Sequence, residues 1–450
     1  MRSRLTIGAA SFAGLALAVA AVQPISNPDT FGHLAQGRAI ANAGGPPRLD
    51  PFSFWRSDPQ PWVNYEWLSD WGAWLVQQAF GWNGLLALAI LLVAGSGGAL
   101  VLLTDRRAGP RAAWLASVLL VLAAPAVRLR LSARPHLVAL PFAVLYLAVV
   151  TSEETFADRR RGTRAMIGLA LAQVLWANLH GSHLLGLAIL GTSALAALPD
   201  RARAGRLALT TLLCAIASGI SPWGPAMALD AARHVFDPTY REVVAEWQPL
   251  TELGWTWTTV QALLTAAAIA LVAPTALRAG PAARTWLGVS VLLSIAAFRS
   301  QRFVEEMLLL SAPLIAIGVA ERAKPRLDRA GPAVAGASMI AAAAIGVVGH
   351  AQIDSEIPFG VGADLRFVPA EAGEHVAREL GEVRVFGSMP TEWYLMLAAP
   401  EARVLVDGRV PFYGPEHVRE ATRALGVPWV IEPYLRRFPI EAIVVQHSAT

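Results

Sequence analysis

The 450-residue chain has little charge, one cysteine and one lysine. Asp, Glu, Lys and Arg make up 16% of it and hydrophobic residues 55%, whereas a typical soluble domain is roughly 25% charged. This composition argues against a soluble enzyme and excludes collagen-like, disordered and disulfide-rich small proteins. Cys214 alone cannot form an intramolecular disulfide or a cysteine-based zinc site. The net charge is +4, but no polar segment interleaves basic and aromatic residues, so we do not expect nucleic-acid binding.

Hydrophobic runs, in contrast, recur along most of the chain. A membrane-spanning helix needs about 20 mostly apolar residues. Residues 1–349 are therefore predicted to form an all-α polytopic bundle of about eleven transmembrane helices, the shorter of which extend into polar flanks or cross a thin bilayer. The eleven apolar segments lie near residues 6–22, 84–104, 112–127, 137–151, 165–179, 184–198, 207–220, 258–277, 285–298, 306–320 and 332–349.

Basic residues indicate the orientation, because short cytoplasmic loops carry an excess of Lys and Arg. Alternate connections are basic: Arg2 with Arg4, then DRRAGPR, EETFADRRRGTR, PDRARAGR, ALRAGPAAR and ERAKPRLDR. We therefore predict a cytoplasmic N-terminus, with residues 23–83, 221–257 and 350–450 outside. The first apolar segment is either an uncleaved anchor or a cleaved signal peptide. We favour the anchor, because the polar motif at 27–33 needs a fixed position against the membrane.

The first outside segment, residues 23–83, is polar but rich in tryptophan. Trp67, Trp71 and Trp74 recur at helical spacing, which predicts an amphipathic helix at the lipid headgroups. A second short helix is expected near 31–42, capped by Asp29 or else by Thr30. Asp29 and His33 are four residues apart and would share one face. They suit a general base with its partner or two ligands of a divalent ion; a helix cap and an interfacial histidine are the structural alternative.

Three further histidines, His136, His180 and His183, fall at the outside ends of predicted spans. Ionisable groups at membrane depth usually mark a water-filled functional cavity. Interfacial hydrogen bonding is the alternative role. In the third outside segment, Glu246 and Trp247 either face the same cavity as Asp29 or belong to the surface.

Two outside turns contain arginines against the charge rule. The first, RLRLSAR, includes Arg134, and the second, FRSQRFVEE, includes Arg299 and Arg302. A guanidinium suits a bound phosphate, and it also suits lipid headgroups. Local salt bridges of the second turn with Glu305 and Glu306 are a further alternative.

The tail, residues 350–450, changes pattern from about residue 366. Helical and strand-like stretches alternate through PAEAGEHVARELG, EVRVFGS, PTEWYLMLA, ARVLVDGR, PEHVREATRAL and EAIVV. This alternation predicts a small α/β domain with parallel strands. It has no glycine-rich phosphate loop. In DGR, a turn with Asp407 paired to Arg409 is expected.

Several motifs together resemble a large bacterial family of membrane proteins with the architecture of the GT-C glycosyltransferases. These are PDTFGHLAQGRAI, RLDPFSF with PWVNYEWL, WANLHGS, ISPWG with AEWQPL, FRSQRF and VLVDGR. The family usually has a D-W-W-H-L type sequence where this chain has DTFGHL, so the acidic and histidine positions match and the aromatic pair is reduced to Phe31. The resemblance implies a transferase in a bacterial inner membrane that uses a polyprenyl-phosphate-linked sugar on the extracytoplasmic side. It also implies that Asp29 activates the acceptor hydroxyl or helps to hold a divalent ion.

The candidate site combines the resemblance with the predicted topology. The candidate catalytic residues are Asp29, His33, Glu66 and His180; the candidate ligands of the donor phosphate are Arg134, Arg299 and Arg302; and His136, His183 and Glu246 are expected to line the same cavity. No cofactor is required by these motifs, although a divalent cation at Asp29 is a candidate. A flippase for a lipid-linked sugar and a noncatalytic scaffold are the alternatives. The sequence has neither the internal repeats nor the midplane charges that transporters commonly carry.

Overall fold

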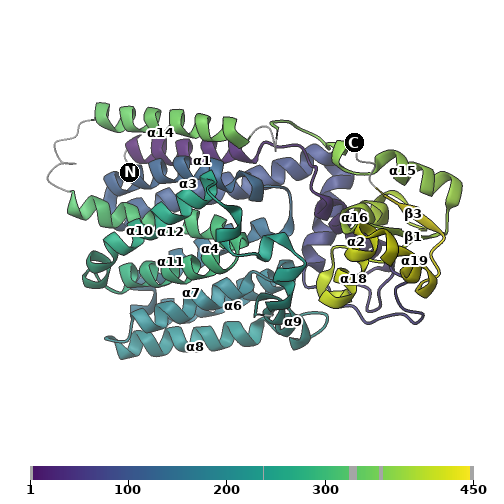
Figure 1. Ribbon diagram of the computed structural model, residues 1–450. Helices are drawn as coiled ribbons and strands as arrows, with labels where there is room; N and C mark the ends of the chain where they lie inside the picture. The colour runs from purple at the N-terminus through teal and green to yellow at the C-terminus, as the bar shows by residue number, and fades with distance from the viewer. Residues whose placement is uncertain (1–3, 237, 324–331, 354–357, 446–450) are drawn as a thin grey trace.

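The computed structural model of the protein is a long helical bundle joined to a smaller α/β tail (Figure 1). It describes residues 4–236, 238–323, 332–353 and 358–445. The long helices of the bundle are α1 (Arg4–Ala21), α3 (Trp67–Val127), α4 (Ala139–Val150), α6 (Arg159–Leu179), α7 (His183–Ala196), α8 (Arg201–Ala217), α10 (Trp257–Arg278), α11 (Pro281–Arg299), α12 (Val304–Arg322) and α14 (Pro332–Ile353). The connections contain α2 (Pro28–Ala43), α5 (Glu153–Ala157), α9 (Pro225–Phe236), and the short 3-10 turns η1 (Arg128–Arg130), η2 (Pro135–Val138), η3 (Pro238–Glu242), η4 (Ala245–Trp247), η5 (Leu250–Leu253) and η6 (Gln301–Phe303).

Each of the eleven predicted apolar segments lies in a helix. The segments 84–104 and 112–127 both belong to α3, together with the tryptophan-rich stretch from Trp67. The backbone of α3 leaves helical geometry at Gly81 (φ 65°) and Gly109 (φ 81°), where glycine has no side-chain penalty. In the described part of the chain, five helices are long and apolar enough to cross a membrane. The protein is thus a multi-pass membrane protein, and the count of about eleven crossings stays a prediction.

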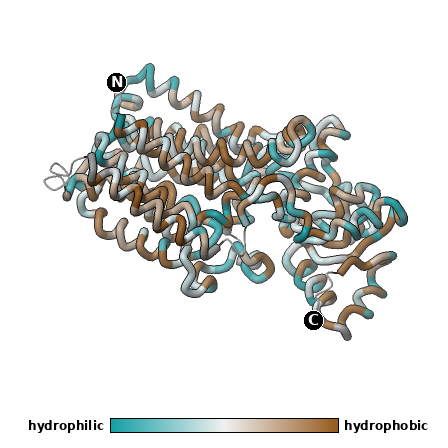
Figure 2. Tube along the Cα trace, turned by 90° about the horizontal axis from the view of Figure 1, so that it is seen from above, coloured by the Kyte–Doolittle hydropathy of each residue, from teal (hydrophilic) through white to brown (hydrophobic). Residues whose placement is uncertain are grey.

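Helix α3 is the central helix of the bundle. Helices α1, α12 and α14 pack along it, while α10 and α11 pack on α12, and α6, α7 and α8 complete the far side. In Figure 1 α14 and α1 lie at the top and α8 at the bottom. Hydrophobic residues predominate along the helices of the bundle, and hydrophilic residues gather at helix ends and in the tail (Figure 2).

The predicted inside and outside connections gather at opposite ends of the bundle. At the inside end, the Arg203 guanidinium donates to the Val150 carbonyl (3.0 Å), and Thr6 donates to Asp105 (2.9 Å). At the outside end, Asn178 donates to the Ile220 carbonyl (2.9 Å). This arrangement agrees with the predicted alternation. Arg2 and most of the basic connection ERAKPRLDR lie outside the described residues.

The tail is an α/β layer whose three strands are parallel, as predicted. Strand β1 lies between β2 and β3. Helix α19 was not among the expected elements. In chain order the tail contains η7 (Leu365–Phe367), α15 (Ala370–His375), η8 (Val376–Leu380), β1 (Arg384–Gly387), α16 (Met389–Ala398), β2 (Arg403–Val404), α17 (Val410–Tyr413), α18 (Pro415–Gly426), α19 (Pro428–Arg437) and β3 (Ala442–Val444).

The loop after α2 is joined to the tail. The Phe54 amide donates to the Val404 carbonyl, and the Val404 amide donates to the Phe52 carbonyl, both at 3.0 Å, so the loop borders the free side of β2. The buried Arg409 pairs with Asp407 (2.7 Å), as expected for the DGR turn, and also with Asp50 of the loop (2.6 Å). Helix α2 packs on α16. The tail is therefore fixed against the end of the bundle that contains the predicted outside connections.

Candidate active site between the bundle and the tail

A cavity of about 620 Å³ opens where the predicted outside end of the bundle meets the tail. Its walls come from α2, the loop before α3, the turn between α3 and α4, the α6–α7 turn, the segment from α9 to η4, the η6 turn and the tail. Eight of the ten candidate site residues line this cavity: Asp29, His33, Glu66, Arg134, His136, His180, Glu246 and Arg302. The fold therefore brings together candidate residues that are up to 273 positions apart in the sequence.

Asp29 lies in the first turn of α2 and its carboxylate is partly exposed in the cavity. The helix is capped by Asn27, whose side chain accepts from the Asp29 amide (3.0 Å), and Pro28 is the first helical residue. Neither Asp29 nor Thr30 is the cap, because the helix begins before them. The Asp29 carboxylate is thus not used as the helix cap.

Asp29 belongs to the first of two charged groups in the cavity, here named the arginine cluster: Asp29, Arg130, Arg134, Glu246 and Arg302. One guanidinium, that of Arg134, donates to the Asp29 Oδ2 (2.5 Å) and to the Glu246 Oε1 (2.8 Å). Arg130 pairs with the other oxygen of Glu246 at 2.7 Å. Burial would raise the pKa of Glu246, but the three arginines outweigh it and hold this pKa well below its usual range.

Arg302 differs from the other two arginines. Its guanidinium lies 4.4 Å from the centre of the Trp247 ring, a cation–π contact. Within the described part of the chain no carboxylate lies at salt-bridge distance from it. Arg302 therefore presents positive charge to the cavity that no ion pair in this region neutralises.

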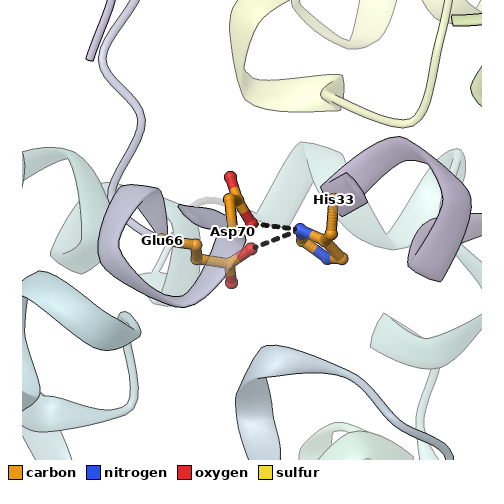
Figure 3. A group of neighbouring side chains, drawn as sticks. All are labelled: His33, Glu66 and Asp70. Atoms are coloured by element: carbon orange, nitrogen blue, oxygen red, sulfur yellow. Dashed lines mark hydrogen bonds and ion pairs between the residues drawn. The ribbon is translucent and has the colours of Figure 1, made fainter. Parts of the chain in front are cut away.

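The second charged group, here named the histidine cluster, consists of His33, Glu66, Asp70 and His180. His33 Nδ1 lies 2.8 Å from an Asp70 oxygen and 3.6 Å from a Glu66 oxygen (Figure 3). The other Glu66 oxygen lies 3.0 Å from His180 Nε2. Asp70, one helical turn after Glu66 in the chain, is fully buried and accepts from Asn64 (2.7 Å). Glu66 thus links the two histidines.

The protonation states follow from these contacts. Burial would lower the pKa of His33, but Asp70, Glu66 and Asp29 outweigh it and raise this pKa to about 9. Burial would raise the pKa of Glu66, but His180, His33 and Arg302 outweigh it and lower this pKa to about 2. At neutral pH His33 is therefore a cation and a donor rather than a base, and Glu66 is an ionised, weak base.

The histidine cluster also offers metal-ligand atoms. One nitrogen of His33 and one oxygen each of Glu66 and Asp70 lie within 4.8 Å of one another. A nitrogen and two carboxylate oxygens are a donor set that zinc takes in proteins. The arrangement thus allows a divalent cation there, whereas Asp29, the ligand expected from the sequence, is paired with an arginine.

Two predicted site residues lie away from the cavity lining. Arg299 is exposed at the end of α11. His183 is buried behind the α6–α7 turn, where its Nδ1 lies 3.3 Å from the His180 carbonyl. The salt bridges of Arg299 and Arg302 with Glu305 and Glu306, which were the alternative to phosphate binding, do not form among the described residues. Instead Glu305 lies 3.5 Å from His136 Nε2.

The tail supplies a wall that the sequence did not predict. Met389, Trp393, Val410 and Phe412 line the cavity. The Trp393 indole fits between two backbones, because a methyl group on Gly32 would lie 1.3 Å from its ring and one on Gly408 would lie 1.4 Å from Nε1. In the described region the buried Trp393 N–H has no hydrogen-bond partner.

Asp70, which supports His33 from behind the cavity lining, and Trp393, which lines the cavity, are two site residues that the sequence analysis missed. Asp70 had a detectable signal, because a residue four positions after Glu66 shares its helical face. Trp393 had none, since its role depends on contacts between α16, α2 and the DGR turn.

Comparison with known proteins shows which solved structures share this fold. No family model matches the chain, and no curated protein matches it. Among solved structures, AglB, an oligosaccharyltransferase from Archaeoglobus fulgidus in complex with an inhibitory peptide and a dolichol-phosphate, matches 98% of this chain and 69% of its own, with a TM-score of 0.74 and 12% identity. The A. fulgidus oligosaccharyltransferase in complex with Zn and sulfate has a TM-score of 0.66 and 13% identity over 97% of this chain and 67% of its own.

A second type of neighbour is ArnT from Cupriavidus metallidurans bound to undecaprenyl phosphate. It has a TM-score of 0.53 and 15% identity, over 94% of this chain and 89% of its own. At these identities the likeness is one of fold. It confirms the GT-C-like architecture that the motifs predicted.

Proposed function

We propose that this protein is a membrane glycosyltransferase that moves a sugar from a polyprenyl-phosphate donor to an acceptor hydroxyl. The observation that carries the proposal is one cavity containing both a partly exposed carboxylate, Asp29, and an arginine, Arg302, outside any described ion pair. The neighbours support the donor class, since AglB is in complex with a dolichol-phosphate and ArnT with undecaprenyl phosphate.

The chemistry needs one base and one anion site. The acceptor oxygen attacks the anomeric carbon, the bond from that carbon to the phosphate oxygen breaks, and the lipid phosphate leaves with the electron pair. Asp29 takes the acceptor proton through its Oδ1, which has no partner among the described residues, while its Oδ2 is bonded to Arg134. Arg302 stabilises the charge that develops on the leaving phosphate. The lipid tail of the donor extends from the cavity into the bilayer.

The histidine cluster positions this machinery. The His33 cation and the Glu66 carboxylate hold α2, the start of α3 and the α6–α7 turn together through the contacts with Asp70 and His180. His136 and the Glu246 carboxylate belong to the same wall. Arg299 and His183, which lie outside the cavity lining, have no part in the proposed reaction.

The acceptor enters along the tail wall. Trp393, Val410 and Phe412 give the cavity an apolar face in addition to its charged groups. Such a face suits the ring or chain of an acceptor. The proposal places this wall on the extracytoplasmic side of a bacterial inner membrane, with the N-terminus in the cytoplasm.

The test compares Asp29→Asn with Arg302→Ala in proteoliposomes that contain a labelled polyprenyl-phosphate-linked sugar. Asp29→Asn keeps the side-chain shape but removes the base, so transfer should fall by about 10² to 10⁴ while donor binding persists. Arg302→Ala should instead weaken donor binding, because the phosphate loses its partner. Arg299→Ala is the matched control, since this arginine lies outside the cavity, and it should change neither quantity.

Two results would contradict the proposal. Full transfer activity in Asp29→Asn would remove the base role, provided the variant has the thermal stability of the unmodified protein. Movement of the donor across the bilayer without any transfer product in the unmodified protein would identify a flippase instead.

A further inference from the structure

The bond network around Arg134 ties together two carboxylates from distant parts of the chain. Asp29 comes from α2 and Glu246 from η4, and each accepts from a different terminal nitrogen of the same guanidinium, at 2.5 and 2.8 Å. The Arg134 side chain is 7% exposed. Both terminal nitrogens therefore already have an anionic partner, which leaves Arg134 poorly placed to bind a donor phosphate.

A divalent cation at Asp29 does not fit this arrangement. The hard divalent cations need about six oxygen ligands. Here Glu246 is the other carboxylate of the arginine cluster; Arg134 bridges it to Asp29, and Arg130 pairs with its other oxygen. A cation placed there would have to displace a buried guanidinium and would be repelled by Arg130 and Arg302.

We propose that Arg134 replaces a divalent cation at Asp29, so that the reaction at this carboxylate is independent of metal. The guanidinium does what such an ion would do: it neutralises two facing carboxylates, fixes the orientation of Asp29 and keeps positive charge beside the leaving phosphate. The part of this inference that concerns sugar transfer rests on the proposed function. The part that concerns ion binding does not, because it follows from the Asp29–Arg134–Glu246 contacts alone.

The test measures Mn²⁺ binding by electron paramagnetic resonance on the full-length protein in detergent after chelator treatment. Arg134→Ala leaves Asp29 and Glu246 facing each other without a counter-ion, so this variant should gain a Mn²⁺ site, and adding Asp29→Asn should remove that site. Arg130→Ala is the matched control. It also removes a cation from Glu246 but leaves the Arg134 bridge, so it should gain no site.

The unmodified protein provides a second measurement that needs no folded Arg134 variant. The unmodified protein and the Asp29→Asn variant should bind Mn²⁺ with the same affinity. Any Mn²⁺ bound by the histidine cluster leaves this expectation unchanged, because Asp29 is not among the ligand atoms of that cluster. Transfer should also persist, within about twofold, after chelation.

A loss of more than about tenfold in Mn²⁺ affinity of the unmodified protein on Asp29→Asn would overturn the inference, since Asp29 would then be a metal ligand. A folded Arg134→Ala variant that binds no more Mn²⁺ than the unmodified protein would overturn it as well. Absence of sugar transfer in every variant would contradict the proposed function but would leave both Mn²⁺ comparisons valid.

Discussion

The two charged clusters of the cavity balance their charges by different means. In the arginine cluster the positive charge is permanent, because a guanidinium stays protonated at any pH the fold meets. In the histidine cluster it depends on protons, since His33 carries its charge through contact with Asp70 and Glu66. The burial differs as well: the Asp29 and Glu246 side chains are each 39% exposed, whereas Asp70 is fully buried. The arginine cluster is thus suited to meet substrate, and the histidine cluster to hold the wall in place.

The largest expected effect is a loss of stability on removal of the buried ion pair between His33 and Asp70 in the histidine cluster. Asp70→Ala leaves the His33 cation without its nearest carboxylate, and breaking a buried pair typically costs about 3–5 kcal/mol. Glu154→Ala is the control, because Glu154 pairs with Arg161 on the exposed surface, where such pairs contribute about 0–1 kcal/mol. Thermal unfolding in detergent measures both. Equal shifts in the two variants would show that the buried pair does not stabilise the fold.

The second prediction uses the proton dependence of the histidine cluster. The pKa of His33 is raised from 6.5 to about 9 in the folded protein, so its stabilisation is fully present below pH 6.5 and is lost as the pH rises through about 9. The shift corresponds to about 3 kcal/mol. The midpoint of thermal unfolding should therefore fall between about pH 7 and pH 10 by more in the unmodified protein than in His33→Gln. The same fall in both would contradict the raised pKa.

The third prediction compares the contributions of two arginines of the arginine cluster to stability. Arg134→Ala leaves Asp29 without an ion pair and removes one of the two ion pairs of Glu246. We therefore expect the free energy of unfolding to fall by about 2–3 kcal/mol. Arg130→Ala leaves Glu246 with its Arg134 partner, so about 1 kcal/mol or less is expected. Chemical denaturation at constant pH compares the two losses. A larger loss for Arg130→Ala would mean that Arg134 is not the central cation.

The sequence predicted the parts of this molecule that depend on local pattern. The apolar segments, the parallel strands of the tail and the pairing of Asp407 with Arg409 follow from periodicity, composition and short spacing, and the structure contains all three. The predicted topology, together with the resemblance, placed Asp29, His180 and Arg302 in one cavity, because all three were expected at outside helix ends, and all three line it.

What the sequence did not predict depends on side-chain direction and on contacts between distant segments. Arg299 and Arg302 are three residues apart and looked equivalent, but α11 ends at Arg299 and the η6 turn directs Arg302 alone into the cavity. Asp29 was expected to act as a general base, to hold an ion or to cap its helix, yet Asn27 is the cap and Arg134, 105 residues away, is the partner of the Asp29 carboxylate. The Arg134 contact has no local signature, whereas Asn27 before Pro28 follows a common pattern for the start of a helix.

The last and smallest expected effect concerns the apolar wall that faces both clusters. Trp393→Phe keeps an aromatic ring between Gly32 and Gly408 but removes part of the indole that lines the cavity. The acceptor loses apolar contact, so its KM should rise by up to about tenfold while kcat stays nearly constant, because the lost contact area corresponds to about 1 kcal/mol. Trp55→Phe is the matched control, since Trp55 also packs against aromatic rings of the tail but does not line the cavity. Steady-state kinetics with varied acceptor measure the difference, and an equal rise in KM for both variants would mean that altered packing of the tail, and not the Trp393 surface in the cavity, changes acceptor binding.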